Sequence, residues 1–297
     1  MKRYVAAVFA ILVVLCVSVF AKDGKLTANE LIEKHIASIG TRDALKTNAD
    51  RDMTGTAVAK PLVGGAGELQ GPVLLMAQAP DKFRLMMQFN SNTYPSDEFF
   101  FNGQKLSISN IRPGYHSRLG EFLYQREVIL KDGLLGGALS SAWALLDVNA
   151  RKAKLTYDGI KKADGRDLHQ ITYMPKKNAD QLVIKIYFEP ETFRHVLTTY
   201  AFTTRAEFSS VITENAGMRE HHYHFEEMFS DFRQMNGLTL PTKYSFKYSD
   251  DWDARQPVTN PAASSSSKEN SAMWVYEITF DQFNRAAIPT SAPGAAQ

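Results

Sequence analysis

The sequence is poor in cysteine: its 297 residues include one, Cys16. Cys16 lies in an apolar N-terminal run and is preceded by Leu15, whereas a lipoprotein-processing site has Gly or Ala at that position. Lipid attachment at Cys16 is therefore not expected. If this run is removed, the chain has no thiol, which excludes disulfide scaffolds, thiol catalysis and thiolate metal sites.

The sequence also carries little net charge. It contains 34 Lys and Arg residues against 32 Asp and Glu. Lys2 and Arg3 lie in the N-terminal run, so the rest of the chain has 32 residues of each sign. Binding to nucleic acid or to an anionic membrane surface needs a concentrated positive field, and none is indicated here. With 44% hydrophobic residues, the chain has the composition of a globular protein with an ample core.

Most catalytic motifs are absent as well. The sequence has no G-x-S-x-G elbow, no P-loop, no dinucleotide-binding glycine fingerprint and no H-E-x-x-H motif. A glycine-rich stretch at 64–67 is not followed by a helix pattern, so it lacks the helix N-terminus that would hold a phosphate. We interpret this stretch as a hairpin loop, and we predict no catalytic residue and no cofactor.

The first 21 residues have the pattern of a secretory signal peptide. Two basic residues precede an apolar run over 4–20, and the run leads into Ala21. Because about 17 apolar residues is near the lower limit for spanning a bilayer, an uncleaved membrane anchor is the alternative. We expect cleavage after Ala21, a single domain over 22–288 and a disordered tail at 289–297.

A helix is predicted at the start of this domain. Thr27 is placed as its N-cap, and Glu30, three residues later, completes a capping box. Gly40 supplies the C-terminal stop. The residues on its apolar face are Leu31, Ile32, His35, Ile36 and Ile39. His35 is therefore expected to be a core or boundary histidine rather than a metal ligand.

From residue 53 onward, the hydrophobic period is two for most of the chain. Apolar side chains recur at every second position over 82–89, 184–188, 243–248 and 274–280, and most of the residues between them are polar. Such runs predict strands of a sheet that has one apolar, aromatic-rich face and one wet face.

Tight turns are indicated between the strands. Asn102-Gly103, Asp164-Gly165 and Asn236-Gly237 lie between alternating runs, and such pairs are typical of antiparallel hairpins. A Pro- and Ser-rich stretch at 257–272 is interpreted as a loop insertion between two strands. We therefore predict one antiparallel meander sheet in an α+β fold.

One apolar stretch, residues 134–146, interrupts the strands. Its helical spacing is carried by Leu135, Leu139, Ala142, Trp143 and Leu146. A helix that is apolar nearly all round must be buried on more than one side, so we expect a buried helix here. The Gly136-Gly137 pair weakens this helix and suits a break or a close approach of backbones.

A histidine cluster at 220–227 is rich in metal-ligating side chains. On a strand, His222, His224 and Glu226 share one face, and imidazoles with a carboxylate form a ligand set for zinc. The sequence places no other histidine to complete such a site, so we prefer a solvated strand face and predict no metal. A metal-dependent enzyme that uses His221–His224 is the alternative.

Three stretches resemble the LolA-like family of outer-membrane lipoprotein-sorting proteins, in its broad periplasmic branch. They are the helix at 26–40, the apolar stretch at 133–143, and residues 229–243, where a strand, an Asn-Gly turn and a strand entered through Leu-Pro follow one another. A weaker match spans 187–193. The resemblance implies an unclosed antiparallel β-barrel, curved like a glove, whose apolar concave face is covered by helices.

The resemblance further implies a periplasmic carrier or sensor, not an enzyme, that binds acyl chains of lipoproteins or other lipids in an apolar cavity. Partner proteins in the inner and outer membranes would accompany such a role, and we expect a monomer. A protein-binding periplasmic regulator is another alternative. The side chains expected to line the cavity and lid are Phe83, Leu85, Met87, Phe89, Leu135, Leu139, Trp143, Leu146, Tyr244, Phe246, Trp274, Tyr276 and Phe280.

Overall fold

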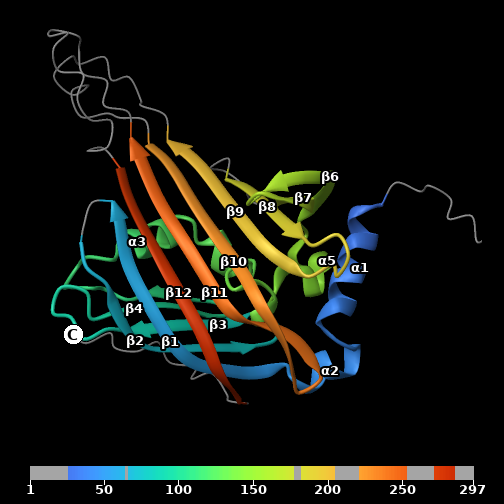
Figure 1. The fold of residues 1–297 in the computed structure, drawn as a ribbon, viewed down its shortest axis with the longest axis horizontal. Coiled ribbons are helices and arrows are strands. Elements are labelled where there is room, and N and C mark those ends of the chain that lie inside the picture. Colours follow the sequence, from blue (N-terminus) through green and yellow to red (C-terminus); the bar gives the residue numbers. More distant parts are fainter. Residues whose placement is uncertain (1–25, 64–65, 177–181, 205–220, 253–270, 285–297) are drawn as a thin grey trace, which may run out of the picture.

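The computed structural model describes residues 26–63, 66–176, 182–204, 221–252 and 271–284. Antiparallel strands make up most of it (Figure 1). The strands are β1 (Asp50–Val63), β2 (Leu69–Gln78), β3 (Lys82–Gln88), β4 (Ser96–Asn102), β5 (Leu106–Ile108), β6 (Lys154–Ala163), β7 (Arg166–Met174), β8 (Val183–Phe188), β9 (His195–Thr204), β10 (His221–Met235), β11 (Leu238–Trp252) and β12 (Ser271–Asn284).

All twelve strands form one sheet, in the order β5-β4-β3-β2-β1-β12-β11-β10-β9-β8-β7-β6. Each half of the chain is a meander of neighbouring hairpins, and β12 returns to pair antiparallel with β1, from Asp52 opposite Asn284 to Val63 opposite Met273. The order ends at β5 on one side and at β6 on the other, and these two strands are not paired with each other. The prediction of an unclosed antiparallel barrel is therefore confirmed.

The helices are short and lie on one face of the sheet. The segment between β5 and β6, which holds α3 and α5, lies behind the long strands in Figure 1. No helix among the described ranges is long and apolar enough to cross a bilayer. The helices are α1 (Ala28–Ile39), α2 (Arg42–Thr47), α3 (Arg118–Gln125), α4 (Val128–Lys131) and α5 (Val148–Arg151), with 3-10 turns η1 (Gly137–Leu139) and η2 (Ala144–Asp147).

The predicted start of α1 is confirmed. The Thr27 hydroxyl accepts a hydrogen bond from the Glu30 backbone N–H at 3.2 Å, and the Glu30 carboxylate accepts one from the Thr27 N–H at 2.8 Å. These two bonds satisfy donors that the first helical turn leaves without partners. Gly40 caps the other end of the helix and forms a β-bridge with Leu238, which ties α1 to the start of β11.

The predicted alternation and hairpin turns are also confirmed. In β3, Phe83, Leu85 and Met87 are buried on the face that meets the helices, whereas the residues between them are partly exposed. Asn236 and Gly237 join β10 to β11 with φ of 49° and 81°. Two successive positive φ values are those of a type I′ turn, whose twist matches that of the strands it joins.

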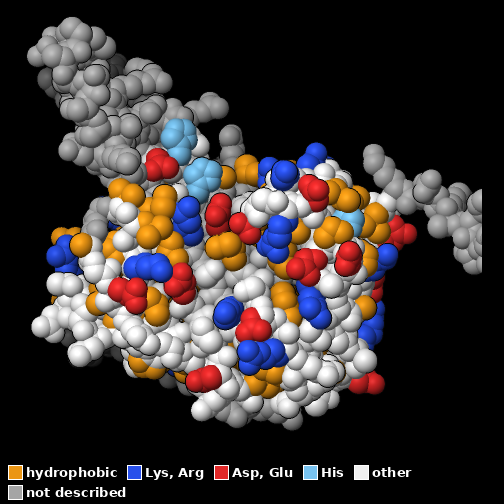
Figure 2. Space-filling model, viewed as in Figure 1, with side chains coloured by type: hydrophobic (Ala, Val, Ile, Leu, Met, Phe, Trp, Pro, Cys, Tyr) orange, Lys and Arg blue, Asp and Glu red, His pale blue; other side chains and the backbone are white. Residues whose placement is uncertain are grey.

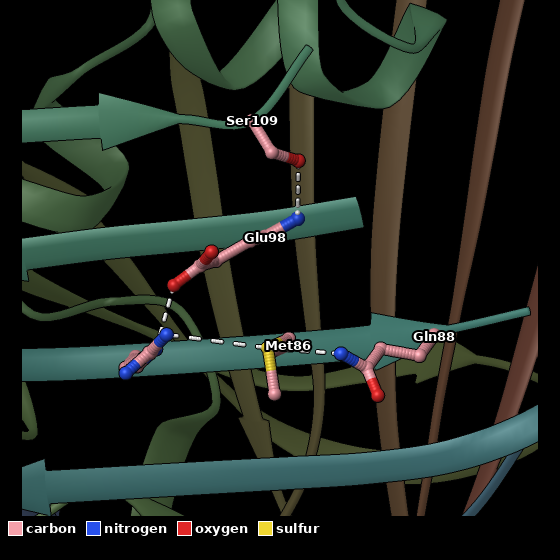
Figure 3. A network of polar contacts seen from close by, with 5 residues as sticks. Met86, Gln88, Glu98 and Ser109 are labelled. Carbon is pink, nitrogen blue, oxygen red and sulfur yellow. Dashed lines mark hydrogen bonds and ion pairs between the residues drawn. The ribbon is translucent and has the colours of Figure 1, made fainter. Parts of the chain in front are cut away.

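The opposite face of the sheet carries charged side chains together with small apolar clusters such as Met76 and Phe100 (Figure 2). Figure 2 shows Lys and Arg side chains interspersed with Asp and Glu over the face turned to the viewer, so neither sign dominates it. On β3 and β4, the Arg84 Nε donates to the Glu98 carboxylate at 2.6 Å. The Glu98 N–H donates to Ser109 at 2.8 Å, and Met86 and Gln88 lie in the same network (Figure 3).

The stretch at 134–146 is buried as predicted, but the prediction of a helix was wrong. Every residue from Gly133 to Leu145 is buried, and the segment contains turns and two short 3-10 pieces. Gly136 and Gly137 have φ of 80° and 49°, which an α-helix does not allow. We call residues 133–146 the plug.

Several predictions concern residues outside the described ranges. They are the signal peptide with its cleavage after Ala21, the tail at 289–297, and most of the loop insertion at 257–272. The single domain over 22–288 also stays a prediction.

Candidate functional site

All thirteen side chains predicted to line a cavity and lid belong to one apolar cluster. Eleven of them are buried, and Leu146 and Trp274 are half-buried. They come from β3, β11, β12, the plug and the residue just beyond β3, so the curvature of the sheet brings distant segments onto one concave face. Their role in binding a ligand remains a prediction.

The plug fills this concavity with protein side chains. Leu139 and Trp143 are essentially inaccessible to solvent, and a Cβ on Gly136 would lie 3.1 Å from the Phe83 ring. Side chains of the plug and the sheet therefore meet in van der Waals contact. A ligand that occupies the concave face must replace part of the plug.

Trp143 connects the plug to α1. Its indole Nε1 donates to His35 Nε2 at 3.1 Å, and His35 Nδ1 lies 3.1 Å from the Phe193 carbonyl oxygen. One tautomer satisfies both contacts, with the His35 proton on Nδ1 and Nε2 as acceptor. Burial lowers the pKa of His35 to about 4, so this imidazole is neutral at pH 7. The interpretation of His35 as a core histidine is consistent with this placement.

A second buried histidine, His195, also packs against Trp143 of the plug and lies with its ring centroid 6.1 Å from that of His35. Its ring stacks on Trp143 with the centroids 4.9 Å apart, and its Nε2 lies 2.7 Å from the Thr198 hydroxyl. A Cβ on Gly137 would lie 2.6 Å from this imidazole, so only glycine allows the approach. The His195 Nδ1 is buried and has no hydrogen-bond partner among the described residues. Burial, with His35 nearby, lowers the pKa of His195 well below its usual value.

A buried carboxyl on the sheet, that of Glu227 on β10, binds the plug by a hydrogen bond. One of its oxygens accepts from the Gly136 N–H at 2.7 Å and from the Tyr244 hydroxyl at 2.6 Å. The other accepts from the Tyr200 hydroxyl at 2.6 Å. Burial raises the pKa of Glu227 to about 7, although these three donors oppose the rise. The Glu227 carboxyl therefore gains or loses its proton near neutral pH.

The sequence-based prediction missed both His195 and Glu227. For Glu227 a signal exists: on β10, Phe225 and Phe229 share its face, so the carboxyl interrupts an apolar row. A carboxyl that takes the place of an apolar residue on the buried face of a strand must itself be buried, and it then needs hydrogen-bond donors as neighbours. His195 gives no such signal, because it is the first residue of β9 and follows a turn.

A separate pocket of about 490 Å³ lies beside α3, at the ends of β10 and β11. We call it the rim pocket. Aromatic rings and charges of both signs line it, including Tyr115, Arg118, Glu121, Phe122, Tyr223, Tyr248 and Asp250. The size is within the range of roughly 300–1,000 Å³ that is usual for small-molecule sites.

Two histidines of the cluster, His222 and His224, lie on the outer face of β10. Tyr223 and Phe225 point to the core side, whereas His224 is exposed on the other face and His222 Nδ1 lies 3.1 Å from the Thr203 hydroxyl. Within the described residues, no three His, Cys, Asp or Glu side chains are grouped to hold a metal ion. His222 and His224 therefore lie on the opposite face of β10 from Phe225 and Glu227, which face the core.

No protein-family model and no curated protein sequence matches the chain. Among solved structures, it is similar to a LolA superfamily protein from Nitrosomonas europaea, at 9% identity and a TM-score of 0.42, over 89% of this chain and 96% of that one. It is also similar to an outer membrane lipoprotein-sorting protein domain from Vibrio parahaemolyticus, at 9% identity and a TM-score of 0.42, over 86% of this chain and 91% of that one.

A third similar structure is a DUF1329 family protein from Desulfovibrio piger, at 10% identity and a TM-score of 0.36, over 86% of this chain and 91% of that one. The first two structures carry the family name that the sequence motifs predicted. At identities near 10% and TM-scores below 0.5, the function has to be argued from the residues of this chain.

Proposed function

We propose that this protein is a periplasmic carrier or sensor that binds an acyl chain of a lipid or lipoprotein on its concave face, in place of part of the plug. It catalyses no reaction in this role. The observation that carries the proposal is the plug: an apolar segment without long regular structure occupies an aromatic-lined concavity. An acyl chain offers the sheet the same kind of surface that the plug now covers.

The hydrogen bonds of the plug favour such an exchange. Several of its backbone bonds are internal, among them Leu139 to Gly136, Ser140 to Gly137 and Ala144 to Gly133. These bonds can be kept when the plug leaves the sheet. The bonds from Gly136 to Glu227 and from Trp143 to His35 are lost, but in the open state water can replace them.

The free energies involved are of comparable size. Each buried methylene of an acyl chain contributes roughly 0.8 kcal/mol, so eight methylenes give about 6 kcal/mol before ordering costs. Exposing a leucine or similar side chain of the plug costs about 1.5–3 kcal/mol. Displacing two or three such side chains costs about 3–9 kcal/mol, which is comparable to the gain from eight methylenes, and each further methylene of a longer chain strengthens binding.

Lipid extraction from the purified protein, followed by mass spectrometry, tests whether a ligand is bound. The affinity for a series of fatty acids is then measured by the fluorescence of Trp143, with Trp252→Phe and Trp274→Phe in place. We expect the affinity to rise with chain length and the emission to change on binding. An affinity that is independent of chain length contradicts the proposal.

The substitution Leu139→Glu tests whether the plug lies at the binding site. An unpaired carboxylate beneath the closed plug costs several kcal/mol, so Leu139→Glu favours the open state, and we expect acyl chains to bind more tightly while the strand signal in circular dichroism remains. Ile160→Glu is the matched control, because Ile160 on β6 is 55% exposed and lies outside the cavity. Normal binding by Leu139→Glu would show that the plug is not the ligand-facing segment.

A further inference from the structure

The rim pocket has an aromatic wall and an acidic one. Tyr115, Tyr223 and Tyr248 line it, and Phe122, which is 4% exposed, forms its inner side. The Phe122 ring lies 5.6 Å from Tyr248 and 6.1 Å from Tyr223 between centroids, so three rings meet there. Aromatic faces with nearby carboxylates are the surroundings that an ammonium group prefers.

Charges of both signs converge at these tyrosines. Glu121 and Asp250 line the pocket, and Arg118 Nη1 lies 3.7 Å from the Asp250 carboxylate. The pKa values of Tyr223 and Tyr248 are both raised, mainly by burial and next by Asp250, with smaller effects from Arg118 and Glu121 on both rings and an opposing effect of Arg126 on Tyr223. Charges of both signs therefore act on the same small volume.

This arrangement matches a zwitterion. A guanidinium is a strong partner for phosphate, and two carboxylates among aromatic rings suit a primary or quaternary amine. The head of an amine-bearing phospholipid carries both groups on a short tether. We propose that the rim pocket binds the zwitterionic headgroup of such a phospholipid while its acyl chain occupies the concave face. The proposal rests on the acyl-chain binding proposed above and names the class of lipid.

One row of packed aromatic rings connects the rim pocket to the buried site. Phe122 lies 6.0 Å from Phe225, and Phe225 stacks on Tyr200 at 5.2 Å. The Tyr200 hydroxyl donates to Glu227, which holds the plug at Gly136. A lipid with its head against α3 can therefore pass its chain inward by displacing Phe122, along a path that is aromatic up to the plug.

The test compares two lysophospholipids that have the same acyl chain, one with an ethanolamine head and one with a glycerol head. Affinities are measured by calorimetry on the full protein, below the concentration at which the lipids form micelles. We expect the ethanolamine lipid to bind about tenfold more tightly, and this ratio to fall to about one in the double variant Glu121→Gln, Asp250→Asn. The control is Glu127→Gln, Asp281→Asn, which removes two acidic residues outside the pocket and should keep the ratio.

Each result is decisive for the headgroup. Equal affinities in the wild-type protein, a preference for the glycerol head, or a ratio that persists in the double variant would overturn it. Dependence on acyl-chain length is measured with the same samples, and it reports on the concave face alone. An affinity that depends on chain length but not on the headgroup therefore rejects headgroup binding in the rim pocket and leaves acyl-chain binding intact. An affinity that depends on the headgroup but not on chain length rejects acyl-chain binding and leaves the rim pocket intact.

Discussion

Replacing Glu227 with glutamine should change the stability of the protein in a pH-dependent way. The carboxyl is fully buried and accepts hydrogen bonds from Tyr200, Tyr244 and the Gly136 backbone. Glutamine keeps one acceptor oxygen for Gly136 and Tyr244, and its amide can donate to the Tyr200 oxygen, because a phenol both donates and accepts. The substitution therefore removes the titration and keeps the shape.

The magnitude follows from the pKa. Burial raises the pKa of Glu227 from 4.5 to about 7, and a tenfold change in proton affinity corresponds to about 1.4 kcal/mol, so the full effect is about 3 kcal/mol. The folded protein holds this proton more tightly than the unfolded chain. Its contribution to the free energy of unfolding is therefore present below about pH 4.5 and is lost as the pH rises to about 7.

Other buried groups would obscure this change in the wild-type protein alone. Asp97, whose pKa is raised to about 6 mainly by burial, acts in the same sense as Glu227. His35, whose pKa is lowered to about 4, acts in the opposite sense, because the unfolded chain takes up a proton on this imidazole first as the pH falls. His195 acts in the same sense as His35. The difference between variant and wild type isolates Glu227.

Urea unfolding of both proteins at several pH values between about 4 and 8 measures this difference. We expect Glu227→Gln to match the wild type at the acidic end and to be more stable by about 3 kcal/mol at the alkaline end. Glu226→Gln, on the outer face of the same strand, controls for the loss of one acid. A constant destabilisation by Glu227→Gln at every pH would refute the reasoning, since hydrogen bonding rather than burial of charge would then dominate.

Three further predictions are independent of Glu227. Gly137→Ala should destabilise by more than about 2 kcal/mol in thermal or urea unfolding, because its Cβ would meet an imidazole at 2.6 Å, whereas Gly165→Ala, also at positive φ but in open space, should cost about 1 kcal/mol. Calorimetric titration with zinc should give no tight stoichiometric binding; such binding, lost in the His222→Ala, His224→Ala double variant, would restore the metal alternative. N-terminal sequencing of the exported protein should show that residues 1–21 are removed; an intact leader in the membrane fraction would contradict this.

Features set by local interactions could be predicted from the sequence. The capping box of α1 joins residues three apart, and the Asn236-Gly237 turn depends on two neighbouring φ values. The alternation of Phe83, Leu85 and Met87 depends on the period of a strand alone. Side-chain and backbone chemistry within a few residues decides each of these, so the sequence pattern predicted them.

The plug shows where pattern reasoning reaches its limit. Helical spacing of its leucines predicted burial on several sides, which is confirmed, but also predicted a helix, which is wrong. Positive φ favours glycine at 136 and 137, and Phe83 and His195 in addition leave little or no room for a Cβ there. The residues that exclude a side chain here lie on β3 and β9, so the sequence around the glycines does not reveal them. The glycine pair itself did indicate a break in the helix.

The polar groups beneath the plug could not be assembled from sequence because they meet only in the folded chain. His35, Trp143 and His195 come from α1, the plug and β9, and Glu227 is 91 positions from Gly136, to which it is bonded. A pattern of period two can mark Glu227 as an acid in an apolar row. It cannot name its partners, since the register of β9, β10 and β11 decides which hydroxyls face it.

These polar groups also bear on the free energy of opening. A concavity filled purely by apolar contacts would resist displacement of the plug in proportion to the area it covers. Here the closed state also holds the His195 Nδ1 without a partner among the described residues and a Glu227 carboxyl whose ionisation burial opposes near pH 7. Opening would bring water to both groups, and their solvation would offset part of the apolar cost. Raising the pH through about 7 should therefore favour opening, visible as increased quenching of Trp143 emission by a soluble quencher. Glu227→Gln should abolish this rise, and a rise that persists in the variant would assign it to another group.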